Sequence, residues 1–271
     1  MKMTDVALKQ TYERDGYLFI PGLLSKDEVE YYRKRINRVF DLPESALTNE
    51  DISGKTYLRP DAITNIEDFW PIIFNKKLLA HVKAVLGNET AYTQHSDLQI
   101  NLHAGGLHRD SAYRKFGVGP DWDTSEANYG VVRVAIYLQS YEESGSSLFL
   151  LPGTHKRESV FTRYECLCWN QLRSTLSKFN MRDALPHIFL TNKSRFIKTR
   201  PGDCIVFDQR VIHAGGGLRG QKPKYSIFLS FGQKNIHSHN HRSFYLKRPA
   251  YTKRMPEKLI QRLQKEDLLL K

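Results

Sequence analysis

Apolar side chains recur at helical spacing in the first third of the chain. Over residues 28–40 they fall on one face, and Ser25 followed by Glu28 is the capping-box pattern that starts a helix. Residues 76–86 repeat this spacing and end at Gly87, which can stop a helix. The pattern therefore predicts two amphipathic helices.

Three further segments of this region have other patterns. Residues 5–15 are polar and indicate a short helix, whereas 16–20 are apolar and indicate a buried strand. Residues 41–75 contain proline and glycine between short apolar runs and are interpreted as loop-rich. We expect a mostly helical N-terminal region over about residues 1–90.

The period changes from 3.6 to two after this region. Short runs of strand-forming residues follow one another, separated by turns rich in glycine and proline. The predicted strands cover residues 97–102, 131–138, 147–151, 195–198, 204–208 and 225–231. Many short strands with such turns are typical of a jelly roll rather than a parallel βαβ sheet.

We therefore predict a mainly β fold with flanking helices, a double-stranded β-helix of the jelly-roll or cupin-like type. Its core spans about residues 91–235 and contains a helical insertion near 155–193. A C-terminal helix follows over about 256–269. No repeat or linker divides the chain, so residues 1–271 are interpreted as one domain.

Composition narrows the class of protein. Of the 271 residues, 40% are hydrophobic and 26% are charged, which excludes a disordered or collagen-like chain. No apolar run is long enough to span a bilayer, and no apolar segment opens the chain. Three cysteines form neither a disulfide framework nor a paired zinc motif. We expect a soluble, cytoplasmic protein with reduced thiols and no membrane partner.

The chain is strongly basic, with 41 Lys and Arg against 29 Asp and Glu, a net charge of +12. Such a field attracts anions, including nucleic acids. The basic residues are spread along the chain, however, and do not cluster with aromatic residues. A solvated basic surface is therefore favoured, and nucleic acid is not an expected partner, although a non-catalytic basic jelly-roll binding module stays open as an alternative.

The candidate chemistry lies in His108-Arg109-Asp110. In an extended segment His108 and Asp110 share one face, so both can bind one metal ion. His213 is a candidate third ligand, because it follows a predicted strand and precedes a run of glycines. Two histidines and one carboxylate suit non-haem Fe(II) oxygen chemistry. His237, His239 and His241 alternate in a polar stretch and are interpreted as a surface loop.

In its motifs and in their order, the chain resembles the phytanoyl-CoA dioxygenase family of Fe(II)- and 2-oxoglutarate-dependent oxygenases. The resemblance covers most of the chain. The segments that carry it are Tyr12 to Leu18, Pro21 to Ser25, His108 to Asp110, Glu143 to Leu148, Leu151 to Lys156, Arg200 to Asp203 and Ile212 to Gly216.

The resemblance implies that His108, Asp110 and His213 bind Fe(II), with 2-oxoglutarate as cosubstrate and dioxygen as oxidant. It also implies a basic residue that pairs with the distal carboxylate of 2-oxoglutarate. The family usually has Arg eleven residues beyond the second histidine, whereas this chain has Lys224, with Ser226 on the same strand face.

This departure leaves Lys222 or Arg219 as alternative partners of that carboxylate. Gln99 and Asn101 are further candidate contacts of the cosubstrate. Arg133 is a candidate contact of the cosubstrate or the substrate.

We hypothesise a 2-oxoglutarate-dependent dioxygenase that hydroxylates an unactivated C–H bond of a small metabolite, with anionic and carrier-bound metabolites among the candidates. Asp110 favours hydroxylation over halogenation, because halogenases of this type lack that carboxylate. Desaturation, epoxidation and ring formation stay open, as does the oligomeric state. A metal-dependent oxygenase that uses no 2-oxoglutarate is the alternative enzyme.

Overall fold

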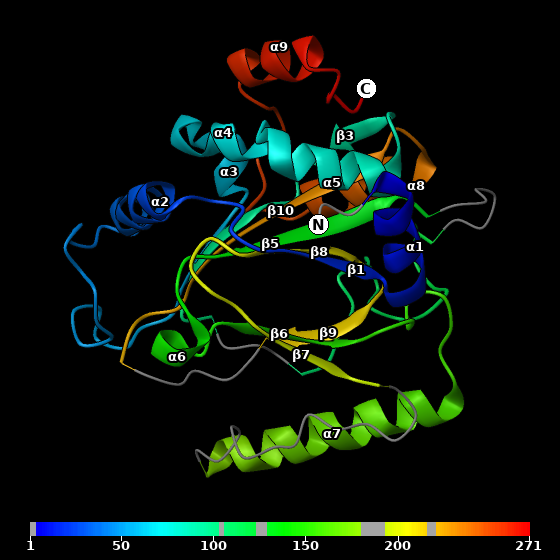
Figure 1. The fold of residues 1–271 in the computed structure, drawn as a ribbon, viewed down its shortest axis with the longest axis horizontal. Helices are drawn as coiled ribbons and strands as arrows, with labels where there is room; N and C mark the ends of the chain where they lie inside the picture. The colour runs from blue at the N-terminus through cyan, green and yellow to red at the C-terminus, as the bar shows by residue number, and fades with distance from the viewer. Residues whose placement is uncertain (1–3, 103–105, 123–128, 180–192, 216–220) are drawn as a thin grey trace.

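A computed structural model of the chain describes residues 4–102, 106–122, 129–179, 193–215 and 221–271. Within these ranges the chain forms four layers: a group of helices, a seven-stranded sheet, a three-stranded sheet and one long helix (Figure 1). The mainly β jelly-roll architecture with flanking helices is confirmed. The two sheets face each other, and the candidate site lies between them.

The strands are β1 (Tyr17–Ile20), β2 (Tyr57–Pro60), β3 (Thr90–Tyr92), β4 (Asp97–Ile100), β5 (Val131–Tyr137), β6 (Ser147–Leu151), β7 (Arg195–Lys198), β8 (Cys204–Asp208), β9 (Ile212–Gly215) and β10 (Tyr225–Gln233). The helices are α1 (Asp5–Asp15), α2 (Lys26–Val39), α3 (Ala62–Asn65), α4 (Trp70–Ile73), α5 (Lys76–Leu86), α6 (Tyr141–Ser144), α7 (Val160–Lys178), α8 (Ile236–Leu246) and α9 (Glu257–Lys265), with a 3₁₀ turn at Glu67–Phe69.

The large sheet has the order β1-β8-β5-β10-β4-β2, with β3 added beside β10, and the small sheet has the order β7-β6-β9. All strand pairs within the two sheets are antiparallel. Because side chains alternate along a strand, each sheet has one face toward the other sheet and one face away from it.

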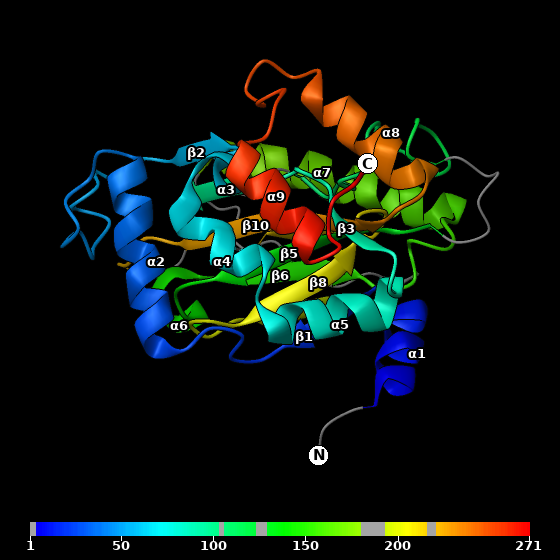
Figure 2. The same cartoon turned by 90° about the horizontal axis from the view of Figure 1, so that it is seen from above.

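The outer face of the large sheet carries the main hydrophobic core. Val132, Val134 and Ile136 of β5 pack there with apolar residues of β10 and of the covering helices. Helices α4, α5 and α9 lie across this face (Figure 2). Burial of this face stabilises the fold by roughly 25 cal/mol for each Å² of apolar surface removed from water.

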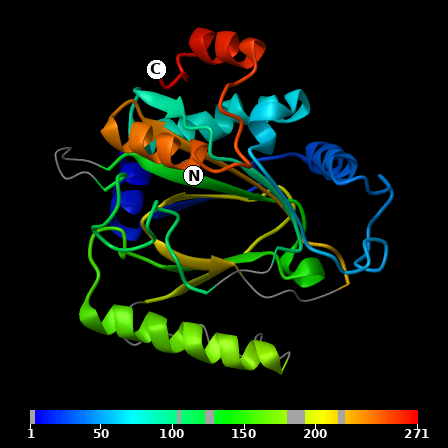
Figure 3. The ribbon, with the colours of Figure 1, turned by 180° about the vertical axis from the view of Figure 1, so that it is seen from behind.

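The small sheet divides its apolar residues between two clusters. Leu148 and Leu150 of β6 face the large sheet, whereas Phe149 and Leu151 face α7. On the α7 side, the ring of Phe149 stacks with that of Trp169, with the centroids 6.0 Å apart. The helix α7 lies alone below this sheet, separated from the other helices (Figure 3).

Several predicted elements are confirmed with small shifts at their ends. The helix predicted over 5–15 is α1, and the helix over 76–86 is α5. The capping box at Ser25 is formed, with Glu28 accepting from the Ser25 backbone N–H at 2.7 Å. The predicted C-terminal helix is α9, which is shorter than expected.

Two predictions are wrong. The loop-rich interpretation of 41–75 misses α3, α4 and the edge strand β2, and both β1 and β2 extend the large sheet beyond the expected core region. The surface loop predicted at His237–His241 is part of α8, and His237 and His241 are buried. Within the described ranges, none of the helices combines the length and the hydropathy needed to cross a membrane.

Candidate metal centre

The two candidate histidines are joined directly through their backbones. His108 donates its N–H to the carbonyl of His213 at 3.0 Å, and His213 donates back to the carbonyl of His108 at 2.9 Å. This antiparallel bridge places the HxD segment beside β9. Asp110 lies two residues beyond His108 on the same face, while Arg109 points away from it and is buried.

The tautomer of each histidine is set by a carbonyl two residues earlier in the chain. His108 Nδ1 lies 2.8 Å from the Gly106 carbonyl oxygen, and His213 Nδ1 lies 3.0 Å from the Val211 carbonyl oxygen. Because a carbonyl only accepts hydrogen bonds, both Nδ1 atoms carry the proton. Each Nε2 therefore offers a lone pair, as a metal-binding imidazole requires.

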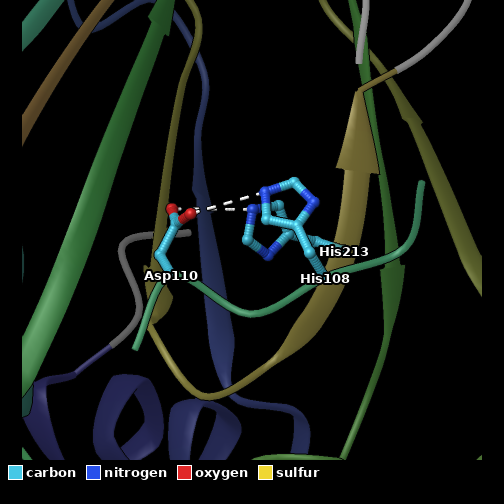
Figure 4. Close-up of side chains that lie close together, drawn as sticks. All are labelled: His108, Asp110 and His213. Atoms are coloured by element: carbon cyan, nitrogen blue, oxygen red, sulfur yellow. Dashed lines mark ion pairs between the residues drawn. The ribbon is translucent and has the colours of Figure 1, made fainter. Parts of the chain in front are cut away.

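These lone pairs point at Asp110 from two sides (Figure 4). The Nε2 atom of His108 lies 3.4 Å from one carboxylate oxygen, and that of His213 lies 3.6 Å from the other. One ligand atom from each residue lies within 4.8 Å of the other two. Two imidazoles and one carboxylate with this convergence fit Fe(II).

The protonation states also suit a cation. Burial lowers the pKa of His213 to about 4, so its ring is neutral near pH 7. Burial alone would raise the pKa of Asp110, but the neighbouring His213 and His108 and the Arg133 guanidinium lower it well below its ordinary value. Near pH 7 the site therefore presents the neutral ring of His213 beside the anionic carboxylate of Asp110.

The segment that carries the ligands is held by contacts with α7 and with Glu158. The side-chain amide of Asn170 on α7 accepts from the Leu107 N–H at 2.6 Å and donates to the Leu107 carbonyl at 3.1 Å. A Cβ at Gly106 would clash with Asn170, so this contact requires glycine. Arg109 donates to Glu158 at 3.0 Å, and its side chain is only 2% exposed.

The metal centre opens into a cavity of about 630 Å³ between the two sheets. The small sheet contributes apolar Leu148 and the candidate ligand His213 to its wall. The large-sheet side contributes polar side chains: Asp97 and Gln99 of β4, Arg133 of β5, and Lys224 immediately before β10.

Of the three candidate partners of the distal carboxylate, Lys224 is the one that the structure places at this cavity. It is only 5% exposed, burial lowers its pKa to about 8, and it pairs with no carboxylate among the described residues. Its Nζ lies 5.5 Å from the ring centroid of Tyr137. Lys222 pairs instead with Glu143 near the surface, and Arg219 lies outside the described residues.

The other predicted cosubstrate contacts differ in position. Gln99 borders the cavity, and Ser226 is buried beside it in register but does not reach the cavity wall. Asn101 is used within the protein: its amide nitrogen donates to Asn49 at 2.7 Å, and its oxygen accepts from the Lys224 backbone N–H at 2.9 Å. Asn101 therefore holds the strand that carries Lys224.

Arg133 lies between two carboxylates. It forms an ion pair with Asp97, and its Nε lies 3.9 Å from Asp110 Oδ2. Its guanidinium also lies 5.3 Å from the ring centroid of Phe228. A cation beside Asp110 favours the ionised carboxylate that a metal ion needs.

Sequence reasoning missed a row of buried polar residues behind the cavity. The buried Asp121 accepts from His241 Nδ1 at 3.1 Å, and His241 Nε2 lies 3.0 Å from His95 Nδ1. Because His241 Nδ1 donates to Asp121, His241 Nε2 accepts from His95, and His95 Nε2 becomes an acceptor at the cavity wall. The four-residue spacing of His237 and His241 is the helical signal that could have placed His241.

Comparison with known proteins gives one family. The family model "Phytanoyl-CoA dioxygenase (PhyH)" matches residues 12–226. Ectoine dioxygenase of Streptomyces avermitilis is 22% identical over 237 residues, which cover 82% of this chain and 76% of that protein. Ectoine dioxygenase of Stutzerimonas stutzeri is 30% identical over 158 residues, which cover 55% of this chain and 50% of that protein.

Solved structures share the fold. HygX from Streptomyces hygroscopicus with nickel and 2-oxoglutarate bound has a TM-score of 0.60 at 17% identity, over 85% of this chain and 87% of that chain. The epimerase SnoN, in complex with Fe3+, alpha ketoglutarate and nogalamycin RO, has a TM-score of 0.59 at 15% identity, over 85% and 84% of the two chains.

Proposed function

The chain belongs to the phytanoyl-CoA dioxygenase family, and on that premise we propose that it hydroxylates an unactivated C–H bond of a small metabolite. It is a 2-oxoglutarate-dependent non-haem iron dioxygenase, with Fe(II), 2-oxoglutarate and dioxygen as cofactor and cosubstrates. Family membership decides against an oxygenase without 2-oxoglutarate and against a non-catalytic binding module.

We assign the metal ligands to His108, Asp110 and His213. The single observation that carries this assignment is that both Nε2 lone pairs converge on the Asp110 carboxylate. When bound, Fe(II) with 2-oxoglutarate activates dioxygen for oxidation of a C–H bond, and the cosubstrate is released as succinate and CO₂. The protein's part is to keep both imidazoles in the binding tautomer and Asp110 ionised.

We assign Lys224 to the distal carboxylate of 2-oxoglutarate. A buried ammonium without a carboxylate partner is costly unless an anion compensates it, and this one borders the cavity. Gln99 of β4 is proposed as a second polar contact of 2-oxoglutarate. Ser226 lies opposite Gln99 on β10, two residues beyond Lys224. Arg133 is assigned to orientation of Asp110, because its guanidinium is already engaged with Asp97.

Asp110 supports hydroxylation, because its carboxylate occupies the position that a halide would need. The substrate is proposed to be small and anionic or carrier-bound, which suits a basic chain and a cavity of about 630 Å³. Residues 1–271 are proposed to act as one domain, since strands from the N-terminal region complete the large sheet. The three free thiols support a cytoplasmic location.

The test is release of succinate from 2-oxoglutarate by anaerobically purified, Fe(II)-loaded protein supplied with dioxygen. The wild type should release succinate even without substrate, though slowly. Asp110→Ala and His213→Ala should release none above background, whereas His239→Ala should match the wild type, because His239 is only half-buried on α8 and does not border the cavity. Activity in the two ligand variants equal to that of the wild type would show that the assigned ligands are wrong.

A further inference from the structure

The cationic side chains that border the cavity outnumber the carboxylates that border it. Among the described residues that border it, the cations are Arg114, Arg133, Lys224 and Arg248, and the carboxylates are Asp97 and Asp110. The cavity therefore has two surplus positive charges. Fe(II) and the 2-oxoglutarate dianion cancel each other, so loading the site leaves that surplus unchanged.

The surplus lies on two exposed arginines that border the cavity, Arg114 and Arg248, and the part of the cavity that they border is called its mouth. Arg133 is paired with Asp97 on the large sheet, and Lys224 is assigned to the cosubstrate. Arg114 and Arg248 remain, and neither forms an ion pair with a described residue. Because the surplus lies on two guanidinium groups, it matches a planar or tetrahedral oxyanion that each arginine can bind through two hydrogen bonds.

Arg248 is held in place by aromatic rings. Its guanidinium carbon lies 4.3 Å from the ring centroid of Tyr245 and 5.2 Å from that of Phe244. His95 stacks on the Tyr245 ring at 3.5 Å with an interplanar angle of 22°, so Arg248 takes the opposite face. Tyr245 in turn donates its hydroxyl to the Asp110 carbonyl at 3.2 Å. Arg248 is thus one aromatic ring away from the metal-binding segment.

Arg114 reaches the same mouth from the HxD segment. It follows Asp110 by four residues and has a left-handed backbone with φ of 56°. Its neighbour Tyr113 packs edge-on against Phe244, with the ring centroids 6.0 Å apart. The two arginines therefore come from segments that contact each other, and both border the cavity that contains the metal centre.

We propose that Arg248, together with Arg114, binds an anionic group of the substrate, a carboxylate or a phosphate. The inference rests on the proposed function and names the substrate class: an anion whose reacting C–H group lies toward the metal centre and whose charge lies at the mouth. Arg248 is then a specificity-determining residue, because a neutral analogue gains no charge-assisted hydrogen bond from either exposed guanidinium group.

The test uses a fluorinated pair of probes on protein loaded with Mn(II) and saturated with 2-oxoglutarate. Trifluoroacetate is the anionic probe and 2,2,2-trifluoroethanol the neutral one, and fluorine relaxation caused by Mn(II) reports binding near the metal. Trifluoroacetate should be relaxed strongly and the alcohol weakly. Arg248→Gln should weaken trifluoroacetate binding about tenfold or more, and Arg114→Gln should weaken it less.

Two controls make the outcome specific. Arg254→Gln removes the same charge from an exposed position that does not border the cavity and should change nothing. Arg248→Lys keeps the charge and should retain part of the binding. The affinity for 2-oxoglutarate, measured by titration of each variant, should stay at the wild-type value.

Three results would overturn the anion site. Equal relaxation of both probes would mean that the cavity does not select an anion. Trifluoroacetate binding unchanged in Arg248→Gln would mean direct ligation to Mn(II) only. Loss of 2-oxoglutarate affinity in Arg248→Gln would assign this arginine to the cosubstrate. A wild-type protein that binds neither Mn(II) nor 2-oxoglutarate would overturn the proposed function itself, whereas normal binding of both with no effect of Arg248 would overturn the anion site alone.

Discussion

The small sheet and the large sheet face each other across the cavity, but they present different kinds of polar group. On the small-sheet side, His213 and the adjoining HxD segment have their ring nitrogens fixed by carbonyls of their own segments. On the large-sheet side, Lys224 is buried without a carboxylate partner among the described residues. The ligands on the small-sheet side are already oriented by the protein, whereas Lys224 on the large-sheet side lacks a counter-charge that a bound anion would supply.

This difference follows from what each wall has to bind. A metal ion needs lone pairs in a set geometry, and hydrogen bonds to backbone carbonyls fix the ring nitrogens in that geometry. A carboxylate needs a positive charge, and such a charge is useful only if no resident carboxylate neutralises it. The two walls therefore respond differently to substitution, and each response can be measured.

Removal of a ligand on the metal side should have the largest effect. Asp110→Ala should weaken Fe(II) binding by more than about 100-fold, which is the upper end of the cost of altering residues around a metal site. Metal titration by calorimetry under anaerobic conditions measures the loss. The affinity of Lys224→Met for Fe(II) alone should stay near the wild-type value, and an equal loss in both variants would refute the separation of the two walls.

Loss of the Arg109–Glu158 ion pair, which supports the metal-binding segment, should have the next largest effect. Arg109→Met should lower the free energy of unfolding by about 3–5 kcal/mol, because it leaves the Glu158 carboxylate, which is nearly buried, without its buried partner. Urea denaturation measures this change. Arg163→Met is the matched control: Arg163 pairs with the same carboxylate but is 64% exposed, so its loss should cost less than about 1 kcal/mol.

Changes on the large sheet should act on the cosubstrate. Lys224→Met should weaken 2-oxoglutarate binding about 10- to 100-fold, the value of a charge-assisted hydrogen bond, without lowering the melting temperature of the ligand-free protein. Lys222→Met removes a lysine two residues away that pairs with Glu143, and it should bind 2-oxoglutarate normally. If the Lys222 variant were the weaker binder, the assignment of Lys224 would be wrong.

The pH dependence of 2-oxoglutarate binding tests the role of Lys224 through the smallest expected effect. Burial lowers the pKa of Lys224 to about 8, so its cationic form predominates below pH 8 and is lost as the pH rises above it. The affinity for 2-oxoglutarate should therefore fall by up to about tenfold per pH unit above 8. Lys224→Arg should remove this decline, because guanidinium stays charged. A decline that persists in Lys224→Arg would have to come from another group.

The sequence predicted the metal side better than the mouth of the cavity. Strand alternation and the H-x-D spacing put His108 and Asp110 on one face, and strong amphipathic patterns located α2 and α5. These features depend on neighbours a few residues apart, which a single sequence displays. Lys224 was predicted through the family resemblance, because it stands eleven residues beyond His213.

Arg248 and the helix α8 before it were missed because their placement depends on contacts between distant segments. Helix α8 has no broad apolar stripe, and its histidines at alternate positions concealed a helix that buries His237 and His241. Edge strand β2 contains Pro60, which weakened its strand signal. Arg248 is placed by the ring of Tyr245, and nothing in the local sequence indicates that this ring stacks on His95.

The reciprocal backbone bridge between His108 and His213 has one more consequence. The spacing of the two imidazoles is a property of the main chain, so an ion neither draws them together nor holds them there. A protein that has lost its iron should keep the shape of the vacated centre and accept a fresh ion without refolding. The main cost of metal binding is then dehydration of the ion rather than reorganisation of the protein, and repeated loss and reloading should leave the enzyme intact.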